Sequence, residues 1–391
     1  MSNSNIRMTD RKFQLTGKLN RQHLQESQKA LTEALQKMNL ASSANSQLYE
    51  DYIEIMDLLK TGSFEGNEAG AEQYLGFAPT EIEEALRRME WGEHFEYLKY
   101  RHHWHKYPHL LRVREFPVHL GIESSSVCDL RCKMCFQSDT EFKRQKSNFG
   151  FMDYELYKRI IDESAERGLC SVKLSIRGEP ILNPMLPQMI AYAREKKLLD
   201  VMFDTNANQL DEDKSRAILQ AEPHLIIFSV DADTKEIFES IRTGAVFERV
   251  LNNITRFLEI KEKESPHAIT KTRVQMTVIP EARHEIDAVR QRWKGLVDQI
   301  AIKEALIRQH TNDTVRENQR PCRVLWQRLD IHYDGSVWLC DNDCYGKYCV
   351  GHVLKESIYE IWHGTKMTRM RELHAERYKH KIEPCKHCDG L

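Results

Sequence analysis

The sequence lacks the features that mark a membrane-bound or secreted protein. Its 391 residues contain no run of about 18 apolar residues, the length that a membrane-spanning helix needs. The mean hydropathy is −0.60, and the opening segment, MSNSNIRMTDRKFQ, has no apolar signal core. We therefore expect a cytoplasmic protein that has no membrane partner.

An excess of charge of either sign is also missing. The chain has 57 Lys and Arg residues against 59 Asp and Glu residues, and its isoelectric point is about 6.8. Proteins that bind nucleic acid usually carry a basic surface, so we expect no nucleic-acid partner. Internal repeats and long low-complexity tracts are absent too. The length suits one large domain with one or two small ones.

Cysteine is absent before residue 128 and abundant afterwards. Ten cysteines are many for a cytoplasmic chain, where thiols stay reduced and clustered thiols usually bind metal or take part in catalysis. Their placement predicts two sites, one central and one C-terminal, while the isolated Cys170 is expected in the core. The central group is Cys128, Cys132 and Cys135, and the C-terminal group is Cys322, Cys340, Cys344, Cys349, Cys385 and Cys388.

Residues 1–115 are predicted to form a helical N-terminal extension with a partly disordered start and no strands. Residues 116–305 alternate between apolar strands and amphipathic helices, which predicts parallel βαβ units in an α/β fold. Such units form an open doubly wound sheet or an incomplete barrel, and ligands bind at the carboxyl ends of the strands. The predicted strands are 118–124, 171–177, 200–206, 224–231, 273–280 and 297–305, and the predicted helices are 153–168, 184–197, 211–221, 234–242, 247–263 and 283–295.

A polar linker, residues 306–321, is predicted to separate this domain from a small C-terminal domain, residues 322–391. The small domain begins with a hairpin, LDIHYDGSVWLC, because Asp334-Gly335 is a strong turn signal between two strand patterns. One continuous helix is predicted to follow the hairpin over residues 357–379.

The central cysteines form a C-x3-C-x2-C motif in the loop that follows the first predicted strand. Three thiolates there can hold three irons of a 4Fe–4S cluster, which leaves the fourth iron open for an external ligand. A structural zinc site that takes a fourth ligand from elsewhere is the alternative. Zinc knuckles favour C-x2-C pairs, so the spacing favours an iron–sulfur cluster.

This motif resembles that of the radical S-adenosylmethionine (radical SAM) enzymes, whose fold is a partial (β/α)6 barrel. The resemblance covers about residues 115–305. It implies that Cys128, Cys132 and Cys135 ligate a 4Fe–4S cluster and that SAM chelates the open iron. One electron, from a partner such as flavodoxin or ferredoxin, cleaves SAM to methionine and a 5′-deoxyadenosyl radical, which abstracts a substrate hydrogen.

Further family motifs match at the ends of the next strands. In SIRGEP, which is similar to a Gly-Gly-Glu motif, Glu179 would hold the SAM ammonium and Gly178 would allow close backbone approach, while Arg177 replaces a glycine. Taken singly, such segments are usually loops or helix caps, but here they follow the cysteines in the family's order. The other cofactor-binding residues that the resemblance implies are Thr205, Asn206, Ser229, Arg242 and Met134.

The C-terminal cysteines resemble those of a SPASM/twitch domain, a small module that binds auxiliary clusters in radical SAM enzymes. The match includes a Gly-x4-Cys hairpin, an IYEIW helix and a closing C-x2-C pair. It implies a second, auxiliary 4Fe–4S cluster, although four thiolates suit a zinc ion equally well by count. Six cysteines favour a single auxiliary cluster over two. The implied ligands are Cys322, Cys340, Cys385 and Cys388.

Two groups of residues remain outside these motifs. Cys344 and Cys349 are structural thiols, alternative ligands or, as a third interpretation, hydrogen-atom donors. The segment RHHWHKYPH carries four histidines, for which a solvated or interface helix face is a better interpretation than a metal site. These histidines are His102, His103, His105 and His109.

An auxiliary cluster with four protein ligands has no open iron, but it can accept an electron. The resemblance therefore implies oxidation of a secondary alcohol on a small sugar, aminosugar or cyclitol. The hydroxyl proton would pass to a base, for which Arg177 and Asp231 are candidates by position. Alternatives within the class are an epimerase, in which Cys349 returns a hydrogen, and a peptide-modifying enzyme. A non-catalytic zinc-binding scaffold is the alternative from another class.

Overall fold

The computed structural model describes residues 13–16, 21–38, 46–61, 63–64, 74–305, 320–386 and 388. The chain divides into two compact units, Gly17–Val118 and a larger unit that joins Met1–Thr16 to His119–Leu391. Most of the predicted linker and residues 1–12 lie outside the described residues. None of the described helices has both the length and the apolar character that a membrane crossing requires.

Six parallel strands form the centre of the larger unit and lie side by side in chain order. A doubly wound sheet reverses its strand order at a switch point, whereas a barrel keeps the chain order. The sheet is therefore that of an incomplete barrel, one of the two predicted alternatives. Its strands are β4 (His119–Ile122), β6 (Ser171–Lys173), β7 (Asp200–Thr205), β8 (Leu225–Ser229), β10 (Lys271–Val278) and β11 (Gln299–Glu304).

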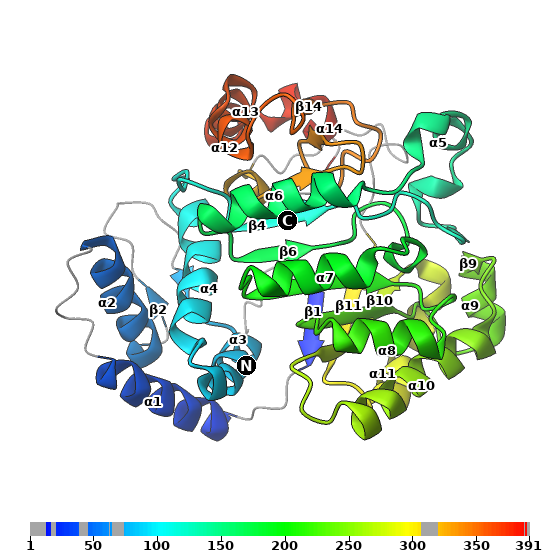
Figure 1. Ribbon diagram of the computed structural model, residues 1–391, viewed down its shortest axis with the longest axis horizontal. Helices are drawn as coiled ribbons and strands as arrows, with labels where there is room; N and C mark the ends of the chain where they lie inside the picture. The colour runs from blue at the N-terminus through cyan, green and yellow to red at the C-terminus, as the bar shows by residue number, and fades with distance from the viewer. Residues whose placement is uncertain are drawn as a thin grey trace, which may run out of the picture. The chain divides into compact units, whose positions relative to one another are not determined.

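Helices connect these strands, and three of them, α6, α7 and α8, lie in a row across one face of the sheet (Figure 1). Asp153 and Asp211 begin α6 and α8 as N-caps, since each accepts a hydrogen bond from the amide three residues later, at 2.9 and 2.8 Å. Helix α7 begins at Leu186 rather than at Pro184. The bounds are α6 Tyr154–Glu166, α7 Leu186–Glu195, α8 Glu212–Gln220, α9 Lys235–Ile241, α10 Phe247–Glu264 and α11 Ile286–Trp293.

Further strands extend both edges of the barrel sheet. Strand β1 (Phe13–Thr16) pairs antiparallel with β11, and β12 (Arg328–Ile331) pairs parallel with β4. Strands β13 (Ser336–Trp338) and β14 (Cys349–His352) complete the sheet. The predicted hairpin between β12 and β13 is confirmed, with Gly335 at a φ of 89° in its turn. The C-terminal domain therefore continues the barrel sheet.

The C-terminal helix is shorter than predicted. It consists of two helices, α12 (Ile358–His363) and α13 (Thr365–Ala375), because Gly364 between them has an extended backbone with a ψ of 158°. Ser357 and Glu360 form a capping box at the start of α12. A short 3-10 helix, η10 (Lys379–Lys381), and α14 (Glu383–Lys386) follow α13.

The smaller unit is mainly helical. The prediction that residues 1–115 contain no strands is wrong, since β1 belongs to the barrel sheet and β2 and β3 form a short hairpin in the smaller unit. These strands are too short for their two-residue periodicity to stand out in the sequence. The elements of this unit are α1 (Arg21–Lys37), α2 (Ser46–Thr61), β2 (Ser63–Phe64), β3 (Tyr74–Leu75), α3 (Pro79–Arg87) and α4 (His94–His109).

Two of the four predicted histidines, His102 and His103, lie on the face of α4 that packs against α2 and not on a solvated face, whereas His105 and His109 are half-buried. His102 and His103 are 0% and 5% exposed, and their Nε2 atoms lie 2.7 Å from Glu54 and 2.9 Å from Asp51 of α2. Asp51, Glu54 and His102 are close enough together to hold a metal ion. The ammonium of Lys106 already pairs with Glu54, so this cluster is explained by ion pairing between two packed helices.

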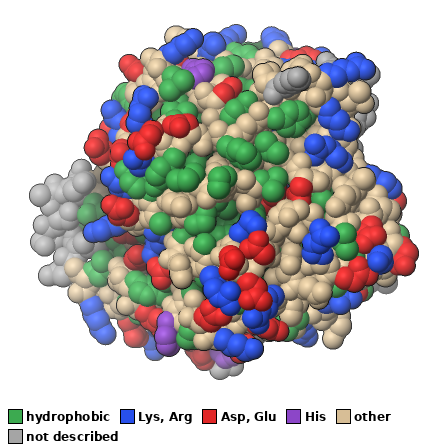
Figure 2. Space-filling view, turned by 45° about the vertical axis from the view of Figure 1, so that its right-hand side comes forward, with side chains coloured by type: hydrophobic (Ala, Val, Ile, Leu, Met, Phe, Trp, Pro, Cys, Tyr) green, Lys and Arg blue, Asp and Glu red, His purple; other side chains and the backbone are tan. Residues whose placement is uncertain are grey.

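Acidic and basic side chains lie interspersed along the lower part of the surface in Figure 2. Hydrophobic side chains gather near the centre of the same view. This mixture agrees with the balanced charge of the chain, 57 basic against 59 acidic residues.

Candidate active site

The three central cysteines lie in the loop after β4. Cys132 belongs to a two-residue strand, β5 (Arg131–Cys132), which pairs antiparallel with β9 (Arg242–Thr243) and places Cys132 opposite Arg242. Burial raises the pKa of the Cys128 thiol to about 12 and that of Cys132 to about 11. Without a metal these thiols are therefore protonated at neutral pH, whereas bound iron takes them as thiolates.

The cysteine loop is fixed against the end of β6 by one glutamine and one glycine. Gln137 Nε2 donates to the carbonyls of Ser126, at 2.9 Å, and Arg177, at 2.6 Å. A Cβ atom on Gly178 would lie 2.3 Å from the Ser125 carbonyl oxygen. Only glycine fits there, so the close approach predicted for Gly178 exists, and its partner is the backbone that precedes Cys128.

Glu179 is buried and receives three hydrogen bonds. They come from Thr205 Oγ1 at 2.8 Å, the Asn206 amide at 2.7 Å and the Ile181 amide at 3.2 Å. Burial nevertheless raises the pKa of Glu179 to about 7. Since Asp211 is the N-cap of α8, Thr205 and Asn206 do not cap that helix, and they orient the Glu179 carboxylate instead.

Asn206 also connects the end of β7 with the cysteine loop. Its Nδ2 atom lies 2.8 Å from Asp129 Oδ1 and 3.9 Å from the sulfur of Cys128. Asn208 donates to the other oxygen of Asp129 at 2.8 Å. Asp129 and Asn208 were not predicted as site residues, although the Asn-Ala-Asn spacing after the strand was a usable signal.

Asp231 and Arg242 form a buried ion pair at the end of β8. The Arg242 Nη2 atom lies 2.6 Å from Asp231 Oδ2, and the Thr277 amide donates to Asp231 Oδ1 at 2.7 Å. Burial by itself lowers the pKa of Arg242, but the charges of Asp231 and Cys132 and the hydrogen bond to Asp231 together outweigh it and raise this pKa. Ser229 is half-buried at the end of the same strand, and Met134 is half-buried in the cysteine loop.

Arg177 forms a two-point ion pair with Glu123, which follows β4, with N–O distances of 2.6 and 2.8 Å. Its guanidinium also lies over the ring of Trp338 on β13, 4.7 Å from the ring centre. Trp338 in turn packs on His332, with ring centres 3.7 Å apart. These contacts join the barrel to the C-terminal hairpin. Glu123 and Trp338 were not predicted, because their proximity depends on the pairing of β12 with β4.

The four C-terminal cysteines predicted as ligands lie together. Electrostatic interactions link Cys340 with Cys322 and Cys385, and Cys385 with Cys322 and Cys388. Burial raises the pKa of Cys340 and Cys385 well above the usual thiol range. Asn342 Nδ2 approaches the sulfur of Cys388 to 3.0 Å.

The described thiols are not arranged as a preassembled tetrahedral zinc site. Thiolates on one tetrahedral zinc lie about 3.8 Å apart, because each Zn–S bond is about 2.3 Å long. Among the described residues, no three cysteines have their sulfur atoms within 4.8 Å of one another.

The remaining cysteines have three different environments. Cys344 is 3% exposed and packs with Phe136 and Phe142, in a cluster that also touches Cys135. Cys349 is exposed on the outermost strand, and its thiol donates to the Gly351 carbonyl at 3.2 Å. Cys170 is only half-buried, so its prediction as a core residue is wrong. It lies where the loop from α6 reaches β6, at the end of the strand away from the site.

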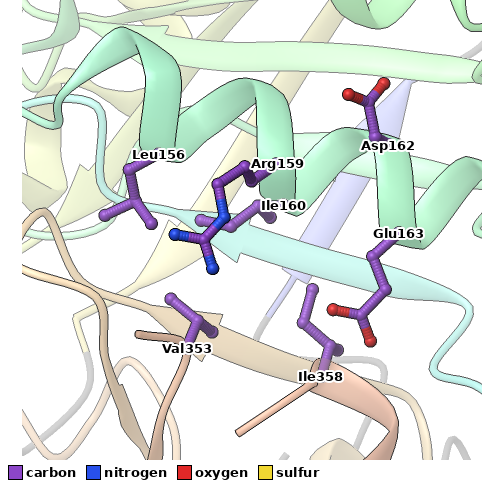
Figure 3. Close-up of a pocket in the computed structure, with 7 residues that line it drawn as sticks. All are labelled: Leu156, Arg159, Ile160, Asp162, Glu163, Val353 and Ile358. Atoms are coloured by element: carbon purple, nitrogen blue, oxygen red, sulfur yellow. The ribbon is translucent and has the colours of Figure 1, made fainter. Parts of the chain in front are cut away.

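A cleft of about 280 Å³ lies between α6 and the C-terminal domain. In Figure 3, side chains of α6, among them Arg159 and Glu163, extend toward Val353 and Ile358. None of the residues at the strand ends lines this cleft. It is therefore separate from the cysteine site.

Two family models match the chain. The radical SAM superfamily matches residues 122–291, and the SPASM iron–sulfur cluster-binding domain matches residues 322–389. The chain is a radical SAM protein with a C-terminal SPASM domain. Its radical SAM domain binds a 4Fe–4S cluster and SAM, and its SPASM domain binds additional iron–sulfur. The residues present fit these groups, since three free thiols and the buried Glu179 lie at the strand ends and four free thiols lie together in the SPASM domain.

Curated proteins and solved structures are similar to this radical SAM chain. The tungsten-containing aldehyde ferredoxin oxidoreductase cofactor-modifying protein of Pyrococcus furiosus is 28% identical over 224 residues, 56% of this chain and 56% of the relative. The S-adenosyl-L-methionine-dependent 2-deoxy-scyllo-inosamine dehydrogenase of Niallia circulans is 21% identical over 278 residues, 70% of this chain and 92% of the relative.

The crystal structure of BtrN in complex with AdoMet and 2-DOIA has a TM-score of 0.50 at 18% identity, and the match covers 71% of this chain and 95% of BtrN. This likeness shows the fold of the radical SAM chain. The chain spans about half the length of the first curated relatives that it matches, 41% and 56%.

Proposed function

We propose that the protein is a SAM-dependent oxidoreductase that converts a secondary alcohol of a small sugar, aminosugar or cyclitol to a ketone. The observation that carries the proposal is the presence of two thiol sites in one unit, three thiols after β4 and four in the SPASM domain. The similarity to the Niallia circulans dehydrogenase supports the substrate class.

When bound, SAM and the central cluster supply hydrogen-atom abstraction, and the second cluster supplies a site for the remaining electron. The protein's part begins with Glu179, whose carboxylate accepts hydrogen bonds from the SAM amino group. Thr205 Oγ1 and the Asn206 amide hold this carboxylate in one orientation. Arg242, opposite Cys132 on the paired strand, would bind the SAM carboxylate.

Asp231 is the better of the two predicted bases. A guanidinium stays protonated in proteins, so Arg177 cannot take a proton from a substrate hydroxyl. A carboxylate has about four lone-pair sites, and Asp231 uses one oxygen for Thr277 and the other for Arg242. It keeps capacity for a substrate hydroxyl. Arg177 acts as a positioning residue that fixes the strand ends.

The epimerase alternative requires a thiol that faces the substrate. Cys349 is exposed on β14, the outermost strand of the sheet. In the described part of the chain, no hydrogen bond or ion pair connects it with Glu179, Asp231 or Arg242. Its position therefore supports the oxidation over epimerisation. The reducing partner, flavodoxin or ferredoxin, is part of the same proposal.

The test is an anaerobic assay of the reconstituted protein with SAM, a reductant and a panel of cyclitols and aminosugars. Each substrate carries deuterium on its secondary carbinol carbons. We expect one ketone per 5′-deoxyadenosine, with deuterium in the 5′-deoxyadenosine, and equal activity in a Cys349→Ala variant. A product with an inverted stereocentre and no ketone, formed by the native protein but not by Cys349→Ala, would instead support the epimerase.

A further inference from the structure

Lys379 is a buried lysine in the SPASM domain. It is 2% exposed and belongs to η10. Within the described residues, no carboxylate forms an ion pair with it. Lysine is almost never fully buried without a partner, because an isolated buried charge is costly. Its burial therefore requires an explanation.

Backbone hydrogen bonds connect the turn of Lys379 with the turn that carries Cys385. The Ile382 amide donates to the Lys379 carbonyl at 3.0 Å, and the Cys385 amide donates to the Ile382 carbonyl at 2.9 Å. The charge of Lys379 acts on Cys385 and on His374. His374 Nδ1 accepts a hydrogen bond from the Cys322 amide at 3.1 Å. Lys379 and Cys385 thus lie in adjoining turns of the chain, close enough for the lysine charge to act on the thiol.

Three other cations near this site have carboxylate partners, whereas Arg371 donates to the carbonyls of Leu325 and Trp362. Arg328 lies 2.7 Å from Asp341 and 3.5 Å from Asp330. Lys347 and Lys386 both pair with Glu383. Among the lysines of these described cations, Lys379 is the one whose charge is not offset by a carboxylate.

A bound cluster supplies the missing negative charge. An oxidised 4Fe–4S core carries two positive charges, and four thiolates bring the net charge to minus two. A buried cation next to this anion stabilises it, and stabilises the reduced form, with one more negative charge, still further. Such a cation therefore raises the reduction potential of the cluster.

We propose that Lys379 is a charge-compensating residue that raises the reduction potential of the C-terminal cluster and so suits it to accept an electron. This inference rests on the proposed function for the use of that electron. The interaction itself depends only on a cluster at Cys322, Cys340, Cys385 and Cys388.

The test measures the reduction potential of the C-terminal cluster alone. Cys128, Cys132 and Cys135 are replaced by Ala in the full chain, and the potential is followed by EPR in an anaerobic redox titration. In this background, we expect Lys379→Met to lower the equilibrium constant for reduction at least tenfold, about 59 mV for one electron. Lys379→Arg, which keeps the charge, should stay near the parent.

Lys381→Met is the matched control, because Lys381 belongs to the same 3-10 helix and is exposed. An unchanged potential in Lys379→Met, or an equal shift in Lys381→Met, would overturn the proposal. If Lys379→Met loses its iron while Lys379→Arg keeps a normal iron content, the result would support the proposal. If both variants lose iron, the role of Lys379 is steric and the proposal is overturned. No turnover is measured, so failure of the proposed reaction would not alter these outcomes.

Discussion

Glu123 and Arg177 form an ion pair that joins the ends of two barrel strands. Two N–O distances, 2.6 and 2.8 Å, connect the carboxylate with the guanidinium. The two side chains are 0% and 3% exposed. Because Arg177 also lies over Trp338, the pair connects the cysteine site with the SPASM hairpin.

Removing one member of this pair should destabilise the larger unit. Glu123→Gln leaves the Arg177 charge buried without its partner, and we expect a loss of about 3–5 kcal/mol in the free energy of unfolding. Anaerobic urea unfolding measures it. Replacing both residues with apolar ones should cost much less than the single change. A small effect of Glu123→Gln would show that water reaches the guanidinium.

Gly178→Ala should prevent assembly of the central site. The added Cβ would lie 2.3 Å from the Ser125 carbonyl oxygen and 2.6 Å from that of Val127. Both are backbone atoms, so the loop that leads to Cys128 must move. We expect the reconstituted variant to lose the iron of one cluster, measured as iron per chain. Gly168→Ala is a control for backbone strain without a clash, since Gly168 has a φ of 74° but nothing lies within 4 Å of its Cβ position.

The affinity for SAM should depend on pH through Glu179. Burial raises the pKa of this carboxyl to about 7 in the protein without SAM. Only the ionised form accepts hydrogen bonds from the amino group, so below pH 7 a proton must leave before SAM binds. The dissociation constant should then rise about tenfold for each pH unit. Calorimetric titration between pH 5.5 and 8, a range of about 1.5 units below and one above that pKa, measures this slope.

Glu179→Gln provides the matched comparison, because the amide has a similar shape and does not titrate. We expect weaker SAM binding with a flat pH profile in this range. A slope that persists in Glu179→Gln would assign the titration to another group.

The smaller unit should lose stability as the pH falls below about 6.5. Burial lowers the pKa of His103 to about 4. The unfolded chain therefore binds a proton that the folded unit does not, and the stability present above pH 6.5 declines toward pH 4. The size of the effect is about 3 kcal/mol. Hydrogen exchange of α4 measures it, with α6 of the larger unit as internal reference.

His103→Gln keeps a donor for Asp51 but removes the titration. The exchange of α4 in this variant, relative to that of α6, should depend less steeply on pH between 4 and 6.5, the interval set by the two pKa values of His103. Equal pH dependence in both proteins would contradict the role given to His103.

The sequence was sufficient to predict the groups that lie at strand ends. Glu179 and Thr205 follow consecutive parallel strands, and such strands bring their carboxyl ends together whatever the details of packing. Gln137 and Asp129 were missed, because their partners lie on other loops. The contact of Arg177 with Trp338 requires the parallel pairing of β12 with β4, a long-range contact that no local periodicity encodes.

The break at Gly364 shows another limit of the sequence. One glycine inside a helical pattern costs only about 1 kcal/mol, so the pattern alone predicts a continuous helix. In the structure Gly364 is extended, and α12 and α13 each bury a separate set of apolar side chains.

The central claim is that one chain holds two iron–sulfur clusters, one in each thiol site. The direct test counts iron, acid-labile sulfide and zinc per chain after anaerobic reconstitution, in the native sequence and in variants with Ala at either set of cysteines. The account predicts about eight irons with matching sulfide, and about four in each variant. Zinc without iron, or four irons that all disappear with Cys128, Cys132 and Cys135, would contradict it.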